Sequence, residues 1–496
     1  MSVDAANPGE IVAAEPQTPP ADTAARDRLV IGLLLVSAFV VILNETIMGV
    51  AIPHLMADLG VTASGAQWLT TAFLLTMAVV IPITGFLLVR FNTRPVFVAA
   101  MSLFSLGTLI GAVAPGLEVL IVARIVQACG TAIMMPLLMT TIMNLVPPHS
   151  RGRTMGNISI VISVAPAIGP TVSGLILAVL DWRFLFILML PIALGALALG
   201  ATRIVNVTTP RKAPIDLVSI PLAIIGFGGF VYGLSGLGEG AMHAGEPALL
   251  PAWIPIAIGL AGIAIFILRQ RALERSDRAL LDFRTLAISN FTIAAGMMAT
   301  AMMGMFGFFI LMPIYLQNVL GLTTLQTGLL LLPGGLVMGL CAPTVGSLYD
   351  RIGPRPLLVP GTILVSLVLW GLTLVTEATP VWLMLGGHFV LSIGLALMFT
   401  PLFTSALGSL PPKLYSHGSA MIGTTQQVAG AAGTALFVAL LTLGTAQGLG
   451  EGLSLEAATA GGTRIAFLVG AVISLLPIAG AFLVRKADAA PEGMAH

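Results

Sequence analysis

The chain has 496 residues, of which 57% are hydrophobic and 9% are charged, with a formal net charge of +1 and a mean hydropathy of +1.03. Soluble globular proteins carry about 25% charged residues, so this composition excludes a water-soluble domain and indicates an integral membrane protein. The low net charge argues against a nucleic-acid partner, which needs a concentrated basic surface. Cys129 and Cys341 are the only cysteines, so neither a disulfide framework nor a thiolate metal site is expected.

The first 28 residues are polar and lack the features of a signal peptide, so they are expected to form a cytoplasmic tail. A membrane span needs about 20 mostly apolar residues to cross a core of about 30 Å. Helix is the expected structure, because isolated strands leave backbone groups unsatisfied in lipid. Fourteen segments meet the length requirement: 30–53, 67–91, 95–115, 118–146, 154–180, 184–204, 217–237, 251–268, 291–320, 327–349, 357–375, 381–410, 419–443 and 465–484.

The positively charged residues test the number and the orientation of these spans. With a cytoplasmic N-terminus, 19 of the 22 Lys and Arg residues fall in cytoplasmic loops. Arg183 and Arg464 fall outside, and Arg124 falls within a span. One missed or extra helix would reverse every later loop and abolish this bias. The sequence therefore predicts fourteen helices with both termini in the cytoplasm.

Two stretches rich in charge or helix breakers, 205–216 and 269–284, flank the seventh and eighth spans. In each set of six remaining spans, the second span ends on a glycine followed by arginines five and nine residues later: Gly85, Arg90 and Arg94, and Gly346, Arg351 and Arg355. Duplicated halves are the usual construction of secondary transporters. The predicted parts are a tail at 1–28, a six-helix bundle at 29–205, an inserted helix pair with linkers at 206–284, a second six-helix bundle at 285–487 and a tail at 488–496.

Glu45 and Arg124 are the only acidic and the only basic residues well inside an apolar span. A charge at that depth costs at least about 2.5 kcal/mol, so it usually has a partner and a function. From the helical rise, Glu45 lies about 22 Å from the inner face and Arg124 about 9 Å from the outer face, at nearly equal depth. We expect the two to meet if the first and fourth helices adjoin, with Gln127 within reach of either. The pair predicts a proton site; a structural ion pair, or a permanently protonated Glu45, is the alternative.

The fifth span contains another group of candidate residues. Ala165, Gly169 and Ser173 form a small-residue strip, and Pro170 permits a bend, so this span is either a hinge or a close packing surface.

The amides of Gln426 and Gln427 need partners or a water-filled cavity, and a cavity lining is the favoured interpretation. Met298 and Met302 belong to a methionine stripe, which adapts to varied ligands but more often serves packing. His388 is expected to be a hydrogen-bonded packing residue. Motifs of P-loop motors, zinc proteases and serine hydrolases are absent, so neither an ATP-driven motor nor an enzyme is expected.

Several of these stretches resemble motifs of the major facilitator superfamily, and within it of the fourteen-helix drug:proton antiporters. The segment Gly169-Pro170-Thr-Val-Ser173-Gly174 is similar to the antiporter motif, with Ser173 where glycine is usual. The segment from Arg124 to Gly130 is similar to the fourth-helix motif whose arginine is implicated in proton coupling.

The resemblance covers nearly the whole chain past residue 30, and lincomycin-efflux-type permeases are the branch it is most similar to. Asp350-Arg351 resembles the loop motif of the second half, and further similar segments are Trp182-Arg183, 313–317 and 416–427.

Two departures from the family pattern are expected to matter. Family members usually carry an acid in Leu-Asp-x-Thr-Ile of the first helix, whereas this chain reads Leu43-Asn44-Glu45-Thr46-Ile47, which turns the acid by about 100°. Val89 stands where the first-half loop motif has its acid. The electrostatics of the inner gate are therefore expected to depend more on Asp350 and Arg351 than on the first-half arginines.

The resemblance implies an all-α integral membrane protein of the major-facilitator fold, with two six-helix bundles and an inserted pair. It implies a bacterial inner-membrane exporter that exchanges amphipathic drugs or toxic compounds for protons by alternating access, with protons as the coupling ion and no cofactor or metal. Neutral or monocationic substrates and a monomer in the lipid bilayer are expected. An exporter of one endogenous metabolite or antibiotic, and a transport-inactive receptor or scaffold, are the alternatives.

The residues expected to act fall into four groups. Proton coupling is assigned to Asn44, Glu45, Arg124 and Gln127; the hinge to Ala165, Gly169, Pro170, Ser173 and Gly174; the cytoplasmic gate to Gly85, Arg90, Arg94, Gly346, Asp350, Arg351 and Arg355; and substrate contact to Met298, Met302, Gln317, Gln426 and Gln427.

Overall fold

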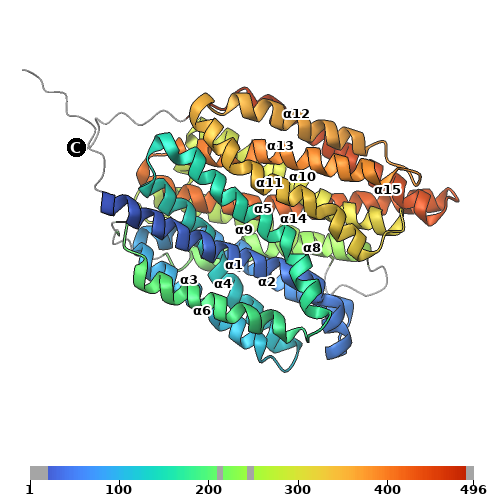
Figure 1. Ribbon diagram of the computed structural model, residues 1–496, viewed down its shortest axis with the longest axis horizontal. Helices are drawn as coiled ribbons and strands as arrows, with labels where there is room; N and C mark the ends of the chain where they lie inside the picture. The colour runs from blue at the N-terminus through green and yellow to red at the C-terminus, as the bar shows by residue number, and fades with distance from the viewer. Residues whose placement is uncertain (1–20, 209, 211–215, 243–250, 487–496) are drawn as a thin grey trace, which may run out of the picture.

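The computed structural model describes residues 21–208, 210, 216–242 and 251–486, and every regular element in these ranges is a helix (Figure 1). Fourteen of the described helical segments are long and apolar enough to cross a membrane, which confirms the number predicted from hydropathy. Most of the tail predicted at 1–28 and all of the tail predicted at 488–496 lie outside the described residues. Helix α1 already begins at Ala21, so the last residues of the predicted first tail are helical.

Six helices form the first bundle. Capping fixes some of their ends: the hydroxyl of Thr62 accepts a hydrogen bond from Gly65 N at the start of α2, and that helix ends on Arg90. A basic side chain at a helix C-terminus interacts favourably with the negative end of the helix dipole. The helices are α1 (Ala21–Leu59), α2 (Ala63–Arg90), α3 (Thr93–Ala112), α4 (Leu117–Leu145), α5 (Arg151–Leu177) and α6 (Arg183–Arg203).

The inserted pair consists of two antiparallel spans. The first is α7 (Ser219–Ala223), a π-helical turn at Ile224–Gly228 called η2, and α8 (Gly229–Met242); the second is α9 (Trp253–Glu274). A Cβ added to Gly259 would lie 2.3 Å from the backbone nitrogen of Phe230, so glycine allows the two spans to touch along their backbones.

The inserted pair is also fixed to its surroundings. Two hydrogen bonds of 2.7 Å join Arg269 to Asp216, and the guanidinium holds the pKa of this carboxyl at about 2. The ring of Tyr232 stacks on Trp68 of α2, and α8 also packs on α14, so the pair touches both bundles.

The second bundle repeats the order of the first. Its second helix begins with a capping box, in which Thr323 and Gln326 satisfy each other's backbone N–H groups. Its last span is broken between two helices at Ser474. The helices are α10 (Ser289–Asn318), α11 (Thr324–Ile352), α12 (Arg355–Leu372), α13 (Val381–Gly408), α14 (Tyr415–Gly450), α15 (Leu455–Ile473) and α16 (Leu475–Ala481).

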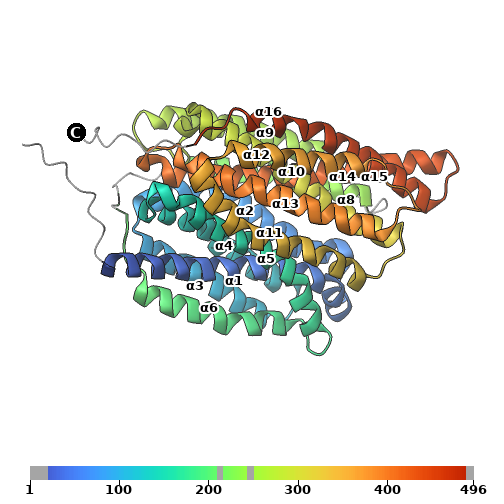
Figure 2. The same cartoon turned by 45° about the horizontal axis from the view of Figure 1, so that its top comes forward.

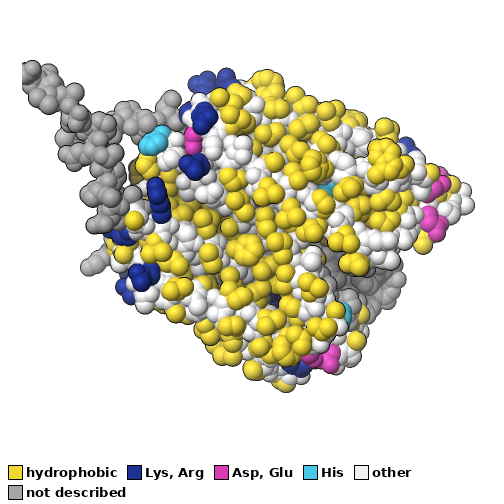
Figure 3. Space-filling view, viewed as in Figure 1, with side chains coloured by type: hydrophobic (Ala, Val, Ile, Leu, Met, Phe, Trp, Pro, Cys, Tyr) yellow, Lys and Arg dark blue, Asp and Glu magenta, His cyan; other side chains and the backbone are white. Residues whose placement is uncertain are grey.

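The first bundle lies below the second in the view of Figure 1, and α5 and α11 run side by side between them in both ribbon views (Figure 2). The inter-bundle contacts are made by α5 with α11 and α13, and by α14 with α2 and α4. The space-filling view shows apolar side chains over the middle of the molecule and Lys and Arg gathered toward the left-hand end (Figure 3). We call this end the basic end.

Candidate functional site

Arg124 on α4 is only 1% exposed, and it is held by neutral partners on three helices. Its Nη1 donates hydrogen bonds to Gln127 Oε1 at 3.0 Å and to Asn44 Oδ1 at 3.3 Å. Its Nε donates to the Leu69 carbonyl at 3.4 Å, and the guanidinium lies 4.0 Å from the centroid of the Phe73 ring. Carbonyl dipoles and an aromatic face stabilise a cation in this apolar setting.

Gln127 connects this arginine to a further helix. Its Nε2 donates a hydrogen bond of 2.9 Å to Thr108 Oγ1 on α3, while its Oε1 accepts from Arg124. A Cβ at Gly107 would lie 2.5 Å from the backbone nitrogen of Gln127, so the absence of a side chain there lets α3 approach α4. A buried polar chain therefore runs from Thr108 through Gln127 and Arg124 to Asn44, and it crosses α3, α4 and α1.

Glu45 lies next to this chain but does not join it. The carboxylate is partly buried and interacts electrostatically with Arg124, yet no ion pair between the described residues connects the two. Neighbouring residues of a helix point about 100° apart, and it is Asn44 whose side chain accepts the hydrogen bond from Arg124 of α4. Helices α1 and α4 adjoin as expected. However, Asn44, at the position of the family's acid, makes the contact, and the expected direct meeting of Glu45 with Arg124 is not formed in this structure.

The small-residue strip of α5 packs against α1. Ala165 and Ser173 are fully buried, and a Cβ at Gly169 would lie 2.2 Å from Thr46 Oγ1. Open space surrounds the Gly174 position, where an added Cβ would meet nothing within 4 Å. The packing therefore requires glycine at position 169 but not at position 174. Helix α5 continues without a break through Pro170. The strip is thus a close packing surface here, and the role of α5 as a hinge stays a prediction.

At the basic end, Asp350 of α11 caps the first turn of α5. Its Oδ1 accepts a hydrogen bond of 2.8 Å from Gly152 N and its Oδ2 accepts one of 2.9 Å from Arg153 N. Lys486 donates to the Asp350 carbonyl at 2.7 Å. A Cβ at Gly346 would lie 2.1 Å from the Gly152 carbonyl oxygen, so the two backbones touch. We call this contact between α5 and α11 the capped flank.

The equivalent contact between α2 and α14 is built differently. A Cβ at Gly85 would lie 3.0 Å from the ring Nδ1 of His417 and 3.3 Å from the backbone Cα of the same residue, so this approach is less close than that at Gly346. Val89 takes the place that Asp350 has in the other repeat, and the described residues provide no side-chain cap for the first turn of α14. We call this contact the uncapped flank. It contains a cavity of about 580 Å³, the seam cavity, whose lining includes Val89, Asn144, Arg284, Lys413, Ser416 and His417.

The predicted gate arginines lie around these flanks. Arg90 is partly buried at the end of α2, and Arg94, Arg351 and Arg355 are exposed. Arg355 Nε donates to the Val484 carbonyl at 3.2 Å, which ties α12 to the end of the last span.

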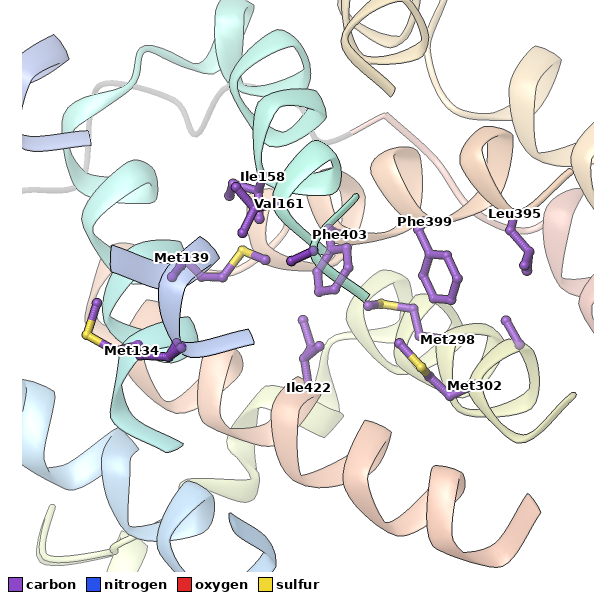
Figure 4. Packing of buried hydrophobic residues seen from close by; sticks show 14 of the residues in the cluster. Met134, Met139, Ile158, Val161, Met298, Met302, Leu395, Phe399, Phe403 and Ile422 are labelled. Atoms are coloured by element: carbon purple, nitrogen blue, oxygen red, sulfur yellow. The ribbon is translucent and has the colours of Figure 1, made fainter. Parts of the chain in front are cut away.

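The five predicted substrate-contact residues do not form one cluster. Met298 and Met302 are buried near Phe399 in an apolar cluster between the bundles (Figure 4). Gln317 is 19 residues beyond Met298 on the same helix, about 28 Å along its axis.

The two amides of α14 have different surroundings. Gln427 Nε2 donates to the Leu74 carbonyl of α2 at 3.5 Å, whereas the buried Nε2 of Gln426 has no hydrogen-bond partner among the described residues. An unpaired buried amide is costly, so Gln426 is the stronger candidate to contact a ligand. His388 behaves as a packing residue: its Nε2 lies 3.0 Å from the Leu331 carbonyl oxygen, and its ring stacks on Phe308.

The sequence reasoning missed two hydrogen bonds that join the bundles inside the membrane. Thr140 of α4 donates to Ser419 of α14 at 3.3 Å, and Ser159 of α5 pairs with Thr400 of α13 at 2.8 Å. Each bond joins the fourth helix of one bundle to the fifth helix of the other. The only signal in the sequence is a Thr and a Ser separated by 19 residues in both bundles.

Comparison with known proteins agrees with this architecture. The family model described as Major Facilitator Superfamily matches residues 34–434. The chain belongs to the major facilitator superfamily. It is 37% identical to the lincomycin resistance protein LmrB of Bacillus subtilis over 91% of this chain and 95% of that protein. It is 31% identical to a multidrug resistance protein B homolog of Mycobacterium tuberculosis, over 84% of this chain and 77% of that protein.

The fold of the superfamily is also found in solved structures. The human organic anion transporter MFSD10 aligns with a TM-score of 0.66 at 15% identity and covers 94% of this chain and 100% of that one. The protein is therefore a multi-pass membrane protein and a secondary transporter of this superfamily, not an enzyme, and it is related to lincomycin and multidrug resistance proteins.

Proposed function

We propose that this transporter exports amphipathic, drug-like compounds from a bacterial cell in exchange for protons. The observation that carries the proposal is the buried Arg124, held by neutral partners with Glu45 beside it. A membrane-embedded acid and base that are close but unpaired can change partners when helices move, and this is what coupling to protons requires. The relation to resistance proteins supports a drug-like substrate.

The transport cycle follows from the contacts between the bundles. The basic end faces the cytoplasm in this proposal, since Lys and Arg concentrate on the cytoplasmic side of membrane proteins. In this proposal the polar contacts at Asp350, Thr140 and Ser159 hold the two bundles together on that side. Protonation of Glu45 from outside accompanies substrate release, and opening of the cytoplasmic contacts lets the proton leave and the next substrate enter. Arg124 acts by exchanging its contact with Asn44 for one with Glu45.

The test is proton-coupled transport by Glu45→Gln in proteoliposomes. Efflux driven by an imposed pH gradient is expected to fall to the level of liposomes without protein, while drug exchange without a gradient persists. The matched control is Glu118→Gln, because Glu118 is an exposed acid at the start of α4. Gradient-driven efflux by the Glu45 variant at the control rate would show that Glu45 is not the coupling residue.

The dependence of export on substrate charge gives a second test of the same proposal. One membrane carboxylate cannot readily accept protons and also neutralise two charges on a ligand, so neutral and monocationic compounds are expected to be exported and dications poorly. A resistance panel in an efflux-deficient host, with and without an uncoupler, measures this. Strong uncoupler-sensitive resistance to dications would contradict it.

A further inference from the structure

Another cavity, with a basic lining, lies where the inserted pair meets the second bundle. Its volume is about 600 Å³, and its walls are the last turns of α9 and the short helix η3 (Phe283–Ala287) that precedes α10. Arg271, Arg275 and Arg284 line it, together with the apolar side chains of Phe283 and Leu286. The cavity therefore has a cationic part beside an apolar part.

Two of these arginines have no partner among the residues that the structure describes. Arg284 pairs with Asp277 and Asp282, both at 2.6 Å. No ion pair or hydrogen bond between described residues involves the exposed side chains of Arg271 and Arg275. The one acid in the lining, Glu274, already accepts a hydrogen bond of 2.6 Å from Phe283 N. The cavity thus has cationic charge that the described protein does not neutralise.

The position of the cavity along α9 matches the polar surface of a bilayer. Arg271 is 18 residues from Trp253, the first residue of α9, which corresponds to about 27 Å of helix. The hydrocarbon core is about 30 Å thick, so Arg271 and Arg275 lie at headgroup level if α9 spans it. Leu268, one turn deeper on the same face, is 68% exposed. A molecule on this face would meet an apolar surface in the core and arginines at its edge.

We propose that this cavity binds the headgroup of an anionic phospholipid, with the phosphodiester between Arg271 and Arg275 and an acyl chain along Leu268. Basic pockets beside membrane helices are suited to such headgroups. The apolar surface favours a lipid over free phosphate, because only a lipid has a chain to cover it. Arg284 also lines the seam cavity, so a bound lipid would lie one side chain away from the uncapped flank. The inserted pair would then connect the surrounding lipid with the second bundle.

Native mass spectrometry of the delipidated full-length protein tests the proposal, with phosphatidylglycerol as the probe and phosphatidylcholine and inorganic phosphate as comparisons. Phosphatidylglycerol is expected to bind at least about tenfold more tightly than phosphatidylcholine. Arg271→Gln/Arg275→Gln is expected to weaken phosphatidylglycerol binding about 30-fold, since each basic residue near the surface contributes about a factor of five. The control is Arg28→Gln/Arg203→Gln, which removes two exposed arginines that line neither cavity and should change binding less than about twofold.

Three results would overturn the proposal. Equal weakening by the two double variants would mean that only overall charge matters. Displacement of phosphatidylglycerol by inorganic phosphate at similar concentration would identify a site for free anions. Unchanged binding in Arg271→Gln/Arg275→Gln, with the same melting temperature as the unmodified protein, would place the lipid elsewhere.

Discussion

The capped and uncapped flanks arise from the same repeated motif, yet they hold the bundles together in different ways. On the capped flank two glycine backbones touch and Asp350 satisfies two N–H groups at the start of α5. On the uncapped flank Gly85 lies against His417. Val89 has no polar atom with which to cap the start of α14, and the seam cavity lies beside it. The flanks thus differ both in the capping acid, which valine replaces, and in the residue that faces the glycine, Gly152 on one flank and His417 on the other. The two flanks are therefore expected to open with unequal ease.

The largest expected effect is at the paired glycines. Gly346→Ala places a Cβ 2.1 Å from a backbone oxygen that cannot move alone, so the closed contact should be lost and drug efflux should fall more than about tenfold. Gly85→Ala meets the His417 ring at 3.0 Å and the His417 backbone Cα at 3.3 Å, so a smaller displacement relieves the contact and efflux should fall less than about threefold. Efflux rates per molecule in cells measure both. Similar losses in the two variants would remove the distinction between the flanks.

Removal of the capping charge comes next. Asp350→Asn weakens hydrogen bonds to a charged group, which contribute about 1.5–3 kcal/mol, so transport should fall about tenfold or more. Val89→Ala removes no polar contact and should leave transport within about twofold. The same efflux assay compares the two. Negligible effects of both would mean that the cap does not control opening.

The hydrogen bonds inside the membrane are expected to have smaller effects. Thr400→Val removes the 2.8 Å bond to Ser159, and Thr140→Val removes the 3.3 Å bond to Ser419. A neutral hydrogen bond contributes about 1 kcal/mol, or about a fivefold change in the equilibrium between closed and open states, and the shorter bond should contribute more. Labelling of Ser416→Cys by a membrane-impermeant maleimide, in a background without Cys129 and Cys341, measures opening at the basic end. A larger increase in the labelling rate for Thr140→Val than for Thr400→Val would contradict the expected order.

The smallest change should come from adding the missing acid. Val89→Asp places a carboxylate near the uncapped N-terminus of α14, where a negative charge contributes about 0.3–1 kcal/mol. The ratio of closed to open molecules should rise about two- to fivefold, and the labelling rate of Ser416→Cys should fall by a similar factor. Val89→Asn has nearly the same volume and serves as the control. Faster labelling with Asp than with Asn would show that the carboxylate does not cap this helix.

Hydropathy and charge bias were enough to predict the helices. Fourteen apolar segments had only one way to satisfy their backbones in lipid, and the described part of the chain has fourteen candidate spans. The charged residues of the site were equally visible, because Glu45 and Arg124 stand out in apolar surroundings. The motif resemblance correctly indicated the superfamily, which the family match over residues 34–434 confirms.

The partners of those residues were decided by tertiary structure alone. Depth along a helix follows from a fixed rise per residue, but the direction of a side chain depends on which neighbour each face meets. Arg124 therefore contacts Asn44 and not Glu45, although both lie at suitable depth. The seam cavity and the bonds at Thr140 and Ser159 likewise depend on residues hundreds of positions apart. A sequence specifies which groups enter the membrane, and only the packing of its helices determines which of them touch.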